Sequence, residues 1–220
     1  MNNYCPLCLD SHPAIWAADS RRSYYRCPNC YLIFADRNSL LSSKQEKAVY
    51  EQHENHIEDL GYRKFLSRIA LPMLNKFSLA ANSNIIGLDF GCGPGPALAA
   101  MFNEAGLKTV VYDPYFANDK SVLTKQYDFV TCTEAIEHFY QPHKEWQLLV
   151  NLVREGGYLG IMTKLARDLD SFKQWHYKND PTHVSFFSQQ TFLFLAKRDG
   201  LDIEFVANDA ILFTKQKRIS

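Results

Sequence analysis

Four of the six cysteines fall into two closely spaced pairs near the amino end of the chain. Cys5 and Cys8 form one C-x-x-C pair, and Cys27 and Cys30 form a second pair after an interval of 18 residues. Each pair can place two thiolates on one side of a tight turn, and two such turns complete the tetrahedral ligand set of a structural Zn²⁺. Two redox-active pairs, or four unrelated thiols, are the alternatives. We predict a zinc ribbon over residues 1–40, in which the metal supplies the folding free energy that so short a segment lacks.

A glycine-rich turn is the second pattern with chemical meaning. Gly91, Gly93 and Gly95 follow an apolar run over residues 84–90, and a helix-forming segment over residues 97–106 comes directly after the turn. Strand, glycine turn and helix in this order form the first unit of a Rossmann-like domain. The glycines lack side chains where the backbone must come close to a bound ligand.

The acid at the end of the next apolar segment helps to identify that ligand. Residues 108–113 end in Asp113, whose carboxylate could accept hydrogen bonds from both hydroxyls of a ribose. Nicotinamide-dependent enzymes also place an acid here, but their G-x-G-x-x-G turn has glycine or alanine where this chain has Pro96. The G-x-G-x-G spacing therefore favours S-adenosylmethionine, whose carboxylate needs less room than a pyrophosphate.

Three histidines could take a proton from an acceptor or hold the acceptor in place. His138 follows a predicted strand, and His176 and His183 lie in the polar and aromatic segment over residues 175–183. Loops at the carboxyl edge of a parallel sheet commonly carry function. His183 is the first candidate for a general base or acceptor-binding residue. The alternative is that the polar groups of this segment only hydrogen-bond to one another.

The elements that must position these residues alternate between strands and helices. Apolar residues recur at intervals of three and four from Leu66 to Phe77, which predicts an amphipathic helix. Residues 121–123 are interpreted as a residual third strand. Further along, the pattern predicts strands over 126–132 and 158–162, helices over 148–153 and 189–198, a turn over 154–157, and a hairpin of strands over 201–206 and 210–214. The predicted fold class is α/β: a Rossmann-like, mostly parallel sheet with a carboxyl-terminal antiparallel hairpin, plus the small amino-terminal zinc ribbon.

Length and charge restrict the domain organisation and the class of partner. The chain has 220 residues, 46% of them hydrophobic, which suits one α/β core and a small appendage. We expect the ribbon over 1–40, a linker and helix over 41–61, and one domain over 62–220. Lysine plus arginine equals aspartate plus glutamate at 24 each, so no overall positive field favours nucleic acid. Without a signal-like amino end or an apolar run of about 18 residues, we expect a cytoplasmic protein with no membrane partner.

Together these motifs resemble the class I S-adenosylmethionine-dependent methyltransferases over about residues 62–215. The whole chain is also similar to a bacterial branch in which a short cysteine ribbon precedes such a domain. The residues that carry the resemblance are Leu88-Asp-Phe-Gly-Cys-Gly-Pro-Gly95, Asp113, Tyr127-Asp-Phe-Val-Thr-Cys-Thr-Glu-Ala-Ile-Glu-His138, Val153-Arg-Glu-Gly-Gly157 and the closing hairpin.

The resemblance implies a role for each motif. It places the methionine end of the cofactor on the glycine turn, with Asp89 supporting that turn, and the ribose on Asp113. The full set of expected cofactor contacts is Asp89, Gly91, Cys92, Gly93, Gly95, Asp113, Thr133 and Glu134. One departure from the family pattern is that only fourteen residues separate Asp113 from Asp128, too few for the usual strand and helix. The adenine-contacting residue is therefore left unassigned.

The predicted reaction is an in-line displacement of a methyl group, in which alignment of nucleophile and methyl supplies most of the acceleration. We expect a small-molecule acceptor, sugar- or quinone-like, beside Glu134, His138, His176, Tyr177 and His183. The implied cofactors are S-adenosylmethionine and Zn²⁺. Two alternatives stay open: a methyltransferase acting on RNA or protein, with the ribbon recognising the macromolecule, and a cofactor-binding module without turnover.

Overall fold

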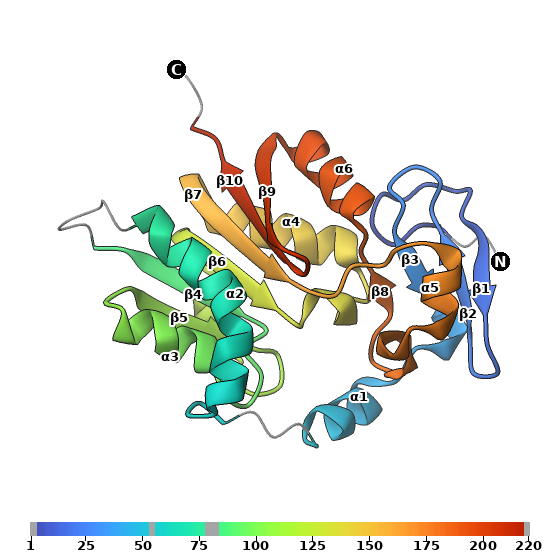
Figure 1. Cartoon of the computed structure of the whole chain (residues 1–220), viewed down its shortest axis with the longest axis horizontal. Helices are drawn as coiled ribbons and strands as arrows, with labels where there is room; N and C mark the ends of the chain where they lie inside the picture. Colours follow the sequence, from blue (N-terminus) through green and yellow to red (C-terminus); the bar gives the residue numbers. More distant parts are fainter. Residues whose placement is uncertain (1–3, 53–55, 78–83, 218–220) are drawn as a thin grey trace.

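A six-stranded sheet forms the centre of the molecule, and a small ribbon lies at one end of it (Figure 1). The computed structural model describes residues 4–52, 56–77 and 84–217. The strands lie in the order β5, β4, β6, β7, β10, β9. Their bounds are β4 Ile86–Phe90, β5 Lys108–Tyr112, β6 Tyr127–Thr133, β7 Val153–Met162, β9 Leu201–Ala207 and β10 Ala210–Lys215.

The strand directions confirm the predicted fold class. Strands β5, β4, β6 and β7 pair in parallel, whereas β10 is antiparallel to both β7 and β9. Six of the seven residues of β6 are buried, because this central strand is covered on both faces. The closing hairpin therefore adds a single reversed strand to an otherwise parallel sheet.

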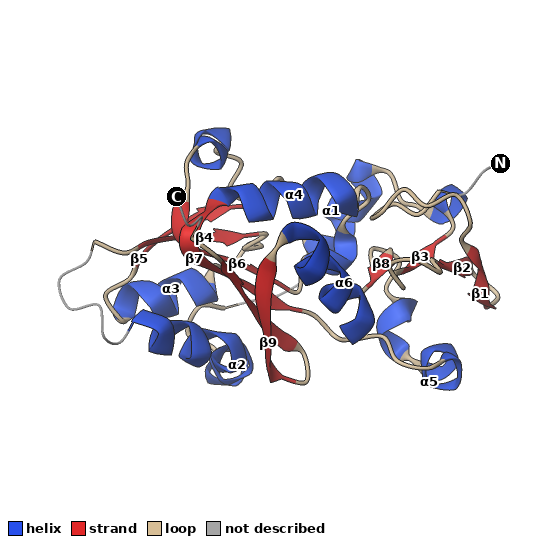
Figure 2. Cartoon of the chain, turned by 90° about the horizontal axis from the view of Figure 1, so that it is seen from above, coloured by secondary structure: helices blue, strands red, loops and turns tan. Residues whose placement is uncertain are grey.

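Helices cover both faces of the sheet (Figure 2). On one face lie α2 (Leu60–Phe77) and α3 (Ala97–Glu104), and on the other lie α4 (Pro142–Leu152) and α6 (Gln189–Asp199). The predicted amphipathic face of α2 is confirmed, since its buried residues are Leu66, Ile69, Ala70 and Met73. None of the helices in the described ranges is long and apolar enough to cross a membrane.

The amino-terminal ribbon shares its sheet with the rest of the chain. Its strands are β1 (Ala14–Ala18), β2 (Ser23–Arg26) and β3 (Ile33–Ala35), and the fourth strand, β8 (Ser185–Phe186), comes from far along the sequence. Strand β3 pairs antiparallel with β8, and the backbone N–H of Ala35 donates to the carbonyl of Val184 at 2.9 Å. The ribbon is thereby joined to the segment that leads into α6.

Shorter elements fill the connections. After β3 comes η1 (Arg37–Ser39), and the linker contains α1 (Ser43–Tyr50), which begins after the N-cap Ser42. Beyond the glycine turn come η2 (Lys120–Thr124), η3 (Ile136–His138), α5 (Leu169–Gln174) and η4 (His176–Asn179). Two of these, η3 and η4, carry residues of the candidate site.

Two local predictions were wrong. Residues 121–123 do not form a third strand: they lie in the 3₁₀-helix η2, whose first turn is capped by the carboxylate of Asp119 accepting from the N–H of Ser121 at 2.9 Å. The turn expected over 154–157 is instead an irregularity inside β7. Tyr127 pairs with Val153 and Phe129 with Tyr158, so β7 carries extra residues between these pairs.

Candidate functional site

A cavity of about 830 Å³ opens at the carboxyl ends of β4, β5 and β6. Its lining includes the glycine turn and Asp113 on one side, and His138, Asp180 and His183 on the other. Helix α1 closes part of the cavity with Glu46 and Tyr50. Ligands of α/β proteins bind at this edge of the sheet, where the strands end and the loops diverge.

The glycine turn is bonded to the end of β5. The N–H of Gly91 donates to the carbonyl of Tyr112 at 2.7 Å, and the N–H of Gly93 donates to a carboxylate oxygen of Asp113 at 3.0 Å. Gly91 has a φ of 75°, and a Cβ there would lie 2.6 Å from the Cβ of Ala135. Only glycine fits this position without displacing the loop that follows β6.

Asp113 is held at the cavity wall by backbone groups. Its Oδ1 accepts from the N–H groups of Tyr115 and Phe116 at 2.8 and 3.1 Å, and its side chain is buried. Three backbone donors thus fix the carboxylate in one orientation. A carboxylate oxygen has more than one lone pair, so these bonds leave capacity for the hydroxyls of a ribose.

Asp89 lies beneath the turn at the end of β4. Its Oδ1 accepts from the hydroxyl of Thr131 on the neighbouring strand β6 at 2.8 Å, and the residue is almost fully buried. Burial raises the pKa of Asp89 from 3.8 to about 6, although the bond from Thr131 opposes this. Asp89 therefore links two strands directly under the turn that it was expected to support.

Glu134 has an unusual backbone conformation. It follows β6 with a φ of 47°, a region that side-chain-bearing residues seldom adopt. Its Oε1 is buried without a hydrogen-bond partner in the part of the chain that the structure describes. Burial and the neighbouring carboxylate of Glu137 raise the pKa of Glu134 to about 8. Thr133, the preceding residue, also lines the cavity.

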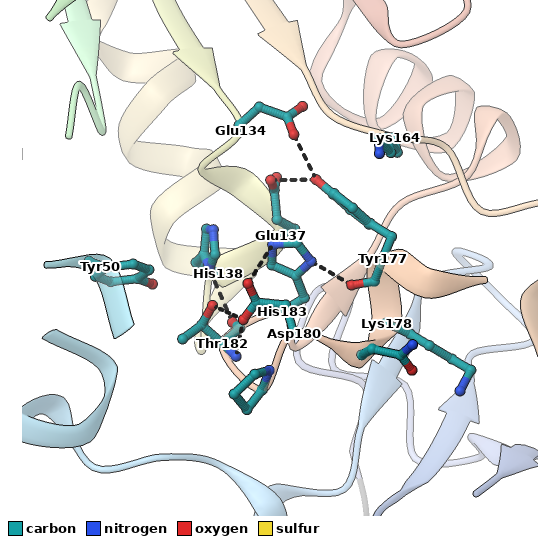
Figure 3. Close-up of polar contacts among 12 residues, drawn as sticks. Tyr50, Glu134, Glu137, His138, Lys164, Tyr177, Lys178, Asp180, Thr182 and His183 are labelled. Atoms are coloured by element: carbon teal, nitrogen blue, oxygen red, sulfur yellow. Dashed lines mark hydrogen bonds and ion pairs between the residues drawn. The ribbon is translucent and has the colours of Figure 1, made fainter. Parts of the chain in front are cut away.

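A buried hydroxyl network orients Glu137 (Figure 3). The hydroxyl of Tyr177 donates to Glu137 Oε1 at 2.5 Å, and the hydroxyl of Thr163 donates to Glu137 Oε2 at 2.9 Å. Tyr177 also lies within 3.4 Å of Glu134 Oε2, so one phenol contacts both carboxylates. Burial raises the pKa of Glu137.

The structure brings two of the three candidate histidines together. The rings of His138 and His183 are 4.7 Å apart between centroids, and both line the cavity. Nδ1 of His183 bonds to the carbonyl of Tyr177 at 2.7 Å, and Nδ1 of His138 bonds to the carbonyl of Thr182 at 3.1 Å. Burial lowers the pKa of His183. His176 lies apart, with its Nε2 3.3 Å from Nζ of Lys164.

The ribbon contacts the loop that carries Tyr177 and His183. Nη2 of Arg22 donates to the carbonyls of Lys178 and Asp180 at 2.5 and 2.8 Å. Nζ of Lys178 is paired with Asp19 at 2.6 Å, and the Lys178 side chain is buried. The turn between β1 and β2 therefore fixes the backbone of this loop.

The four ribbon cysteines converge. Their sulfur atoms all lie within 4.8 Å of one another, and the pairs Cys5 with Cys30 and Cys8 with Cys27 are each 3.4 Å apart. Both C-x-x-C segments fold alike: the next residue, Leu9 or Tyr31, has a positive φ and donates its N–H to the carbonyl of the first cysteine of its pair. A tetrahedral Zn²⁺ with Zn–S bonds of about 2.3 Å separates its sulfurs by about 3.8 Å, so the thiol set fits this ion.

A second cavity, of about 850 Å³, lies between the ribbon and the tip of the closing hairpin. It is lined by residues such as Trp16, Arg26, Lys164 and Asp209. It contains neither the glycine turn nor Asp113. The residues expected to contact the cofactor line the first cavity instead.

Several lining residues were not found from the sequence. Glu46 of α1 accepts hydrogen bonds from the hydroxyls of Tyr50 and Tyr115 at 2.6 and 2.8 Å, and it is almost fully buried beside the cavity. The linker sequence is mostly polar, and nothing in it distinguishes Glu46 from its exposed neighbours. The contact of Glu137, which lines the cavity, with Thr163 behind it was also missed, because it depends on the fold.

The comparisons with known proteins agree with this geometry. A family model described as a methyltransferase domain matches residues 62–205. No curated protein matches the chain. Among solved structures, the plantazolicin methyltransferase BpumL in complex with SAH and a monoazolic desmethylPZN analog has a TM-score of 0.50 at 12% identity, over 79% of this chain and 90% of that one.

Two other solved structures are similar at lower scores. The 1,6-didemethyltoxoflavin-N1-methyltransferase of Burkholderia thailandensis, with bound S-adenosylhomocysteine, has a TM-score of 0.48 at 13% identity, over 93% of this chain and 99% of that one. A SAM-dependent methyltransferase from Archaeoglobus fulgidus has a TM-score of 0.49 at 16% identity, over 70% of this chain and 99% of that one.

The family model spans well over half of the chain, and its limits include the glycine turn, the acid after β5 and the cavity-lining histidines. The chain therefore belongs to the methyltransferase-domain family, and it is a class I S-adenosylmethionine-dependent methyltransferase.

Proposed function

We propose that the protein transfers the methyl group of S-adenosylmethionine to a small molecule bound in the same cavity as the cofactor. The observation that carries this proposal is the two-sided cavity of about 830 Å³, with the glycine turn on one side and His138 and His183 on the other. Small-molecule sites in proteins occupy about 300–1,000 Å³ and combine apolar walls with a few placed polar groups. In this proposal the cavity holds the cofactor and a sugar- or quinone-like acceptor together.

Each wall of the cavity has a proposed task. The glycine turn, with Cys92, receives the methionine end of the cofactor, and Asp113 receives the ribose hydroxyls. Among the described residues, Oε1 of Glu134 has no hydrogen-bond partner and is buried beside this wall, and such an oxygen suits a cationic group of the cofactor. Thr133 contributes to the same wall.

The opposite wall holds the acceptor. Methyl transfer needs little more than alignment of the nucleophile with the methyl carbon, and the firmly bonded loop over 176–183 supplies rigid walls for that purpose. His183 and His138 are positioned to contact the acceptor. His176, outside the cavity lining, is assigned a supporting contact with Lys164.

The arginines of the ribbon support a small-molecule acceptor over RNA. Arg22 is bonded to loop carbonyls, and Arg21 donates to the carbonyl and side chain of Asn179. Arg26 lies over the rings of Trp16 and Tyr31 at 4.5 and 5.2 Å. All three guanidinium groups already contact other groups of this chain, so the ribbon strand is a poor phosphate-binding face.

We further infer that Cys5, Cys8, Cys27 and Cys30 hold one structural Zn²⁺. The basis is the convergence of the four sulfurs and the matching fold of the two C-x-x-C segments. In this proposal the ribbon over 1–40 acts on the domain over 62–220 by holding the loop over 176–183, here called the acceptor loop. The linker over 41–61 contributes α1 to the cavity.

Incubation of the protein and radiolabelled S-adenosylmethionine with separated small-molecule, RNA and protein fractions of a bacterial extract tests the proposal. Label in the small-molecule fraction is expected, and the Asp113→Ala variant should transfer less. Label in the RNA or protein fraction alone would show that the acceptor is a macromolecule. Absence of label from every fraction, with S-adenosylhomocysteine still bound, would favour a module without turnover.

A further inference from the structure

Three potential metal ligands meet on the acceptor side of the cavity. One ligand atom from each of Glu137, His138 and His183 lies within 4.8 Å of the other two. Glu137 and His138 are adjacent in η3, whereas His183 comes from the loop after η4. Two imidazoles and a carboxylate form a donor set that divalent transition-metal ions accept readily.

The hydrogen bonds of the two imidazoles fix their tautomers. Nδ1 of His183 contacts the carbonyl of Tyr177, and Nδ1 of His138 contacts the carbonyl of Thr182. A carbonyl oxygen can only accept, so each Nδ1 carries the proton and donates it. In the neutral ring Nε2 then bears the lone pair. Metal-binding histidines are typically oriented by such a bond from the other ring nitrogen to a carbonyl.

The carboxylate of Glu137 is oriented in the same way. The hydroxyls of Tyr177 and Thr163 donate to its two oxygens, so the carboxylate cannot rotate freely. Each oxygen keeps a further lone pair. All three potential ligands are thus positioned by neighbouring groups, which is a common feature of metal sites.

Asp180 gives an independent reason to expect a cation. Its Oδ2 lies 3.9 Å from Nε2 of His183, and its Oδ1 accepts from the N–H and the hydroxyl of Thr182. With the proton of His183 on Nδ1, two acceptors face each other across this distance. A cation between them would interact with both lone pairs, which an apolar group could not do.

We propose that Glu137, His138 and His183 bind one divalent transition-metal cation, with Asp180 beside it. The site lies in the wall of the cavity assigned to the acceptor. The inference rests on the proposed function. The cation site then implies an acceptor with an oxygen that can bind the cation, such as a phenol, an enol or a hydroxy-carbonyl compound.

The chemistry of such an acceptor balances without a further reactant. A bound divalent cation lowers the pKa of an acceptor hydroxyl, whose proton passes to solvent. The oxygen electron pair then forms the bond to the methyl carbon, and the C–S bond electrons return to sulfur. The products are a methyl ether and S-adenosylhomocysteine.

Mn²⁺ is a suitable probe because it prefers oxygen and nitrogen ligands to thiolates, so the ribbon cysteines do not compete. Titration of the full-length protein with Mn²⁺, followed by electron paramagnetic resonance, should show one bound ion per chain. His183→Ala and Glu137→Gln should each weaken Mn²⁺ binding at least about 10-fold. His12→Ala, which removes an exposed histidine of the ribbon, should leave the affinity unchanged.

Calorimetry with S-adenosylhomocysteine on the same samples separates the possible failures. Thr163→Val removes one hydroxyl that orients Glu137 and should weaken Mn²⁺ binding while S-adenosylhomocysteine still binds. Wild-type protein that binds S-adenosylhomocysteine but no Mn²⁺ would overturn the cation site and leave the methyl transfer standing. Equal Mn²⁺ affinity in the wild type and the ligand variants would also overturn it. Mn²⁺ binding without S-adenosylhomocysteine binding would count against the proposed function instead.

Discussion

Arg22 donates a hydrogen bond from Nη2 to the carbonyl oxygen of Asp180 at 2.8 Å, although the two are 158 positions apart in the sequence. Arg22 precedes strand β2 of the ribbon, and Asp180 lies in the loop that carries His183. The same guanidinium reaches the carbonyl of Lys178 and the hydroxyl of Tyr24. The conformation of the acceptor loop therefore depends on the ribbon.

Replacing Arg22 should loosen this loop. Arg22→Ala removes several charge-assisted bonds to partly buried carbonyls, and we expect the free energy of unfolding to fall by about 1.5–3 kcal/mol. Arg22→Lys should recover only part of this loss, because a lysine lacks the planar fork. Urea titration gives the stability, and hydrogen exchange over 176–183 should become faster. Arg37→Ala, at an exposed position outside this contact, is the control; an equal effect of both variants would contradict the assignment.

Zinc removal should affect the acceptor loop as well as the ribbon. Chelation of the metal, or Cys27→Ser, disrupts the proposed zinc site that holds the ribbon strands together, and β3 of the ribbon pairs with β8. We expect faster hydrogen exchange over 5–35 and over 176–186, with little change over β4 and β5. Metal analysis of the purified wild type should give one zinc per chain. A clearly lower content would dismiss the zinc site.

Gly91→Ala should abolish cofactor binding. An alanine at a φ of 75° costs about 1–2 kcal/mol, and its Cβ would also collide with Ala135. The matched control is Gly106→Ala, at a φ of 83° with open space around the added Cβ. Calorimetry with S-adenosylhomocysteine should detect binding by the control only. Retained affinity in Gly91→Ala would show that the turn can move without loss of the site.

Asp113→Ala should weaken binding of S-adenosylhomocysteine about 10- to 100-fold, since hydrogen bonds to a charged group contribute about 1.5–3 kcal/mol. Asp202→Ala, on the exposed strand β9, serves as the comparison. Calorimetric titration of the two variants measures the difference. Unchanged affinity in Asp113→Ala would mean that the ribose lies elsewhere.

Asp89 should make stability depend on pH. Its pKa is raised from 3.8 to about 6 in the folded chain, so the native state binds more protons than the unfolded state between these values. The free energy of unfolding should therefore fall as pH rises through this interval, by at most about 3 kcal/mol for a pKa difference of about 2. Asp89→Asn should lose this component of the slope. Urea denaturation from pH 4 to 7 compares the two, and parallel profiles would contradict the prediction.

Local patterns allowed much of the fold to be predicted. The glycine turn, the strand that ends at Asp113 and the closing hairpin each depend on residues close together in the sequence, where turn chemistry and periodicity decide the conformation. The strand predicted over 121–123 was wrong because a run of only three residues, one polar and two apolar, fits a short strand and a 3₁₀ turn equally well. The cap by Asp119 decided between them.

Most of the candidate site was predicted from residues at or near the ends of strands. Asp89 lies near the end of β4, Asp113 directly follows β5, and His138 lies in η3 shortly after β6, so their convergence follows from the sheet topology. Glu46 contacts Tyr115 across 69 residues, and its place in the cavity depends on how the linker crosses the domain. No local pattern encodes such a contact, so the linker helix could not be assigned to the site in advance.

The sheet formed by β3 and β8 has a consequence for how this enzyme can diversify. Because β8 follows His183 within a few residues, the segment that lines the cavity and the cysteine-containing ribbon are parts of one structural unit. Consider a chimaera that takes residues 176–186 from a relative but keeps its own amino-terminal 40 residues. Its β3 would then have to pair with a β8 from another protein. We therefore expect acceptor preference to be exchanged between two relatives only when residues 176–186 and the amino-terminal 40 residues are exchanged together.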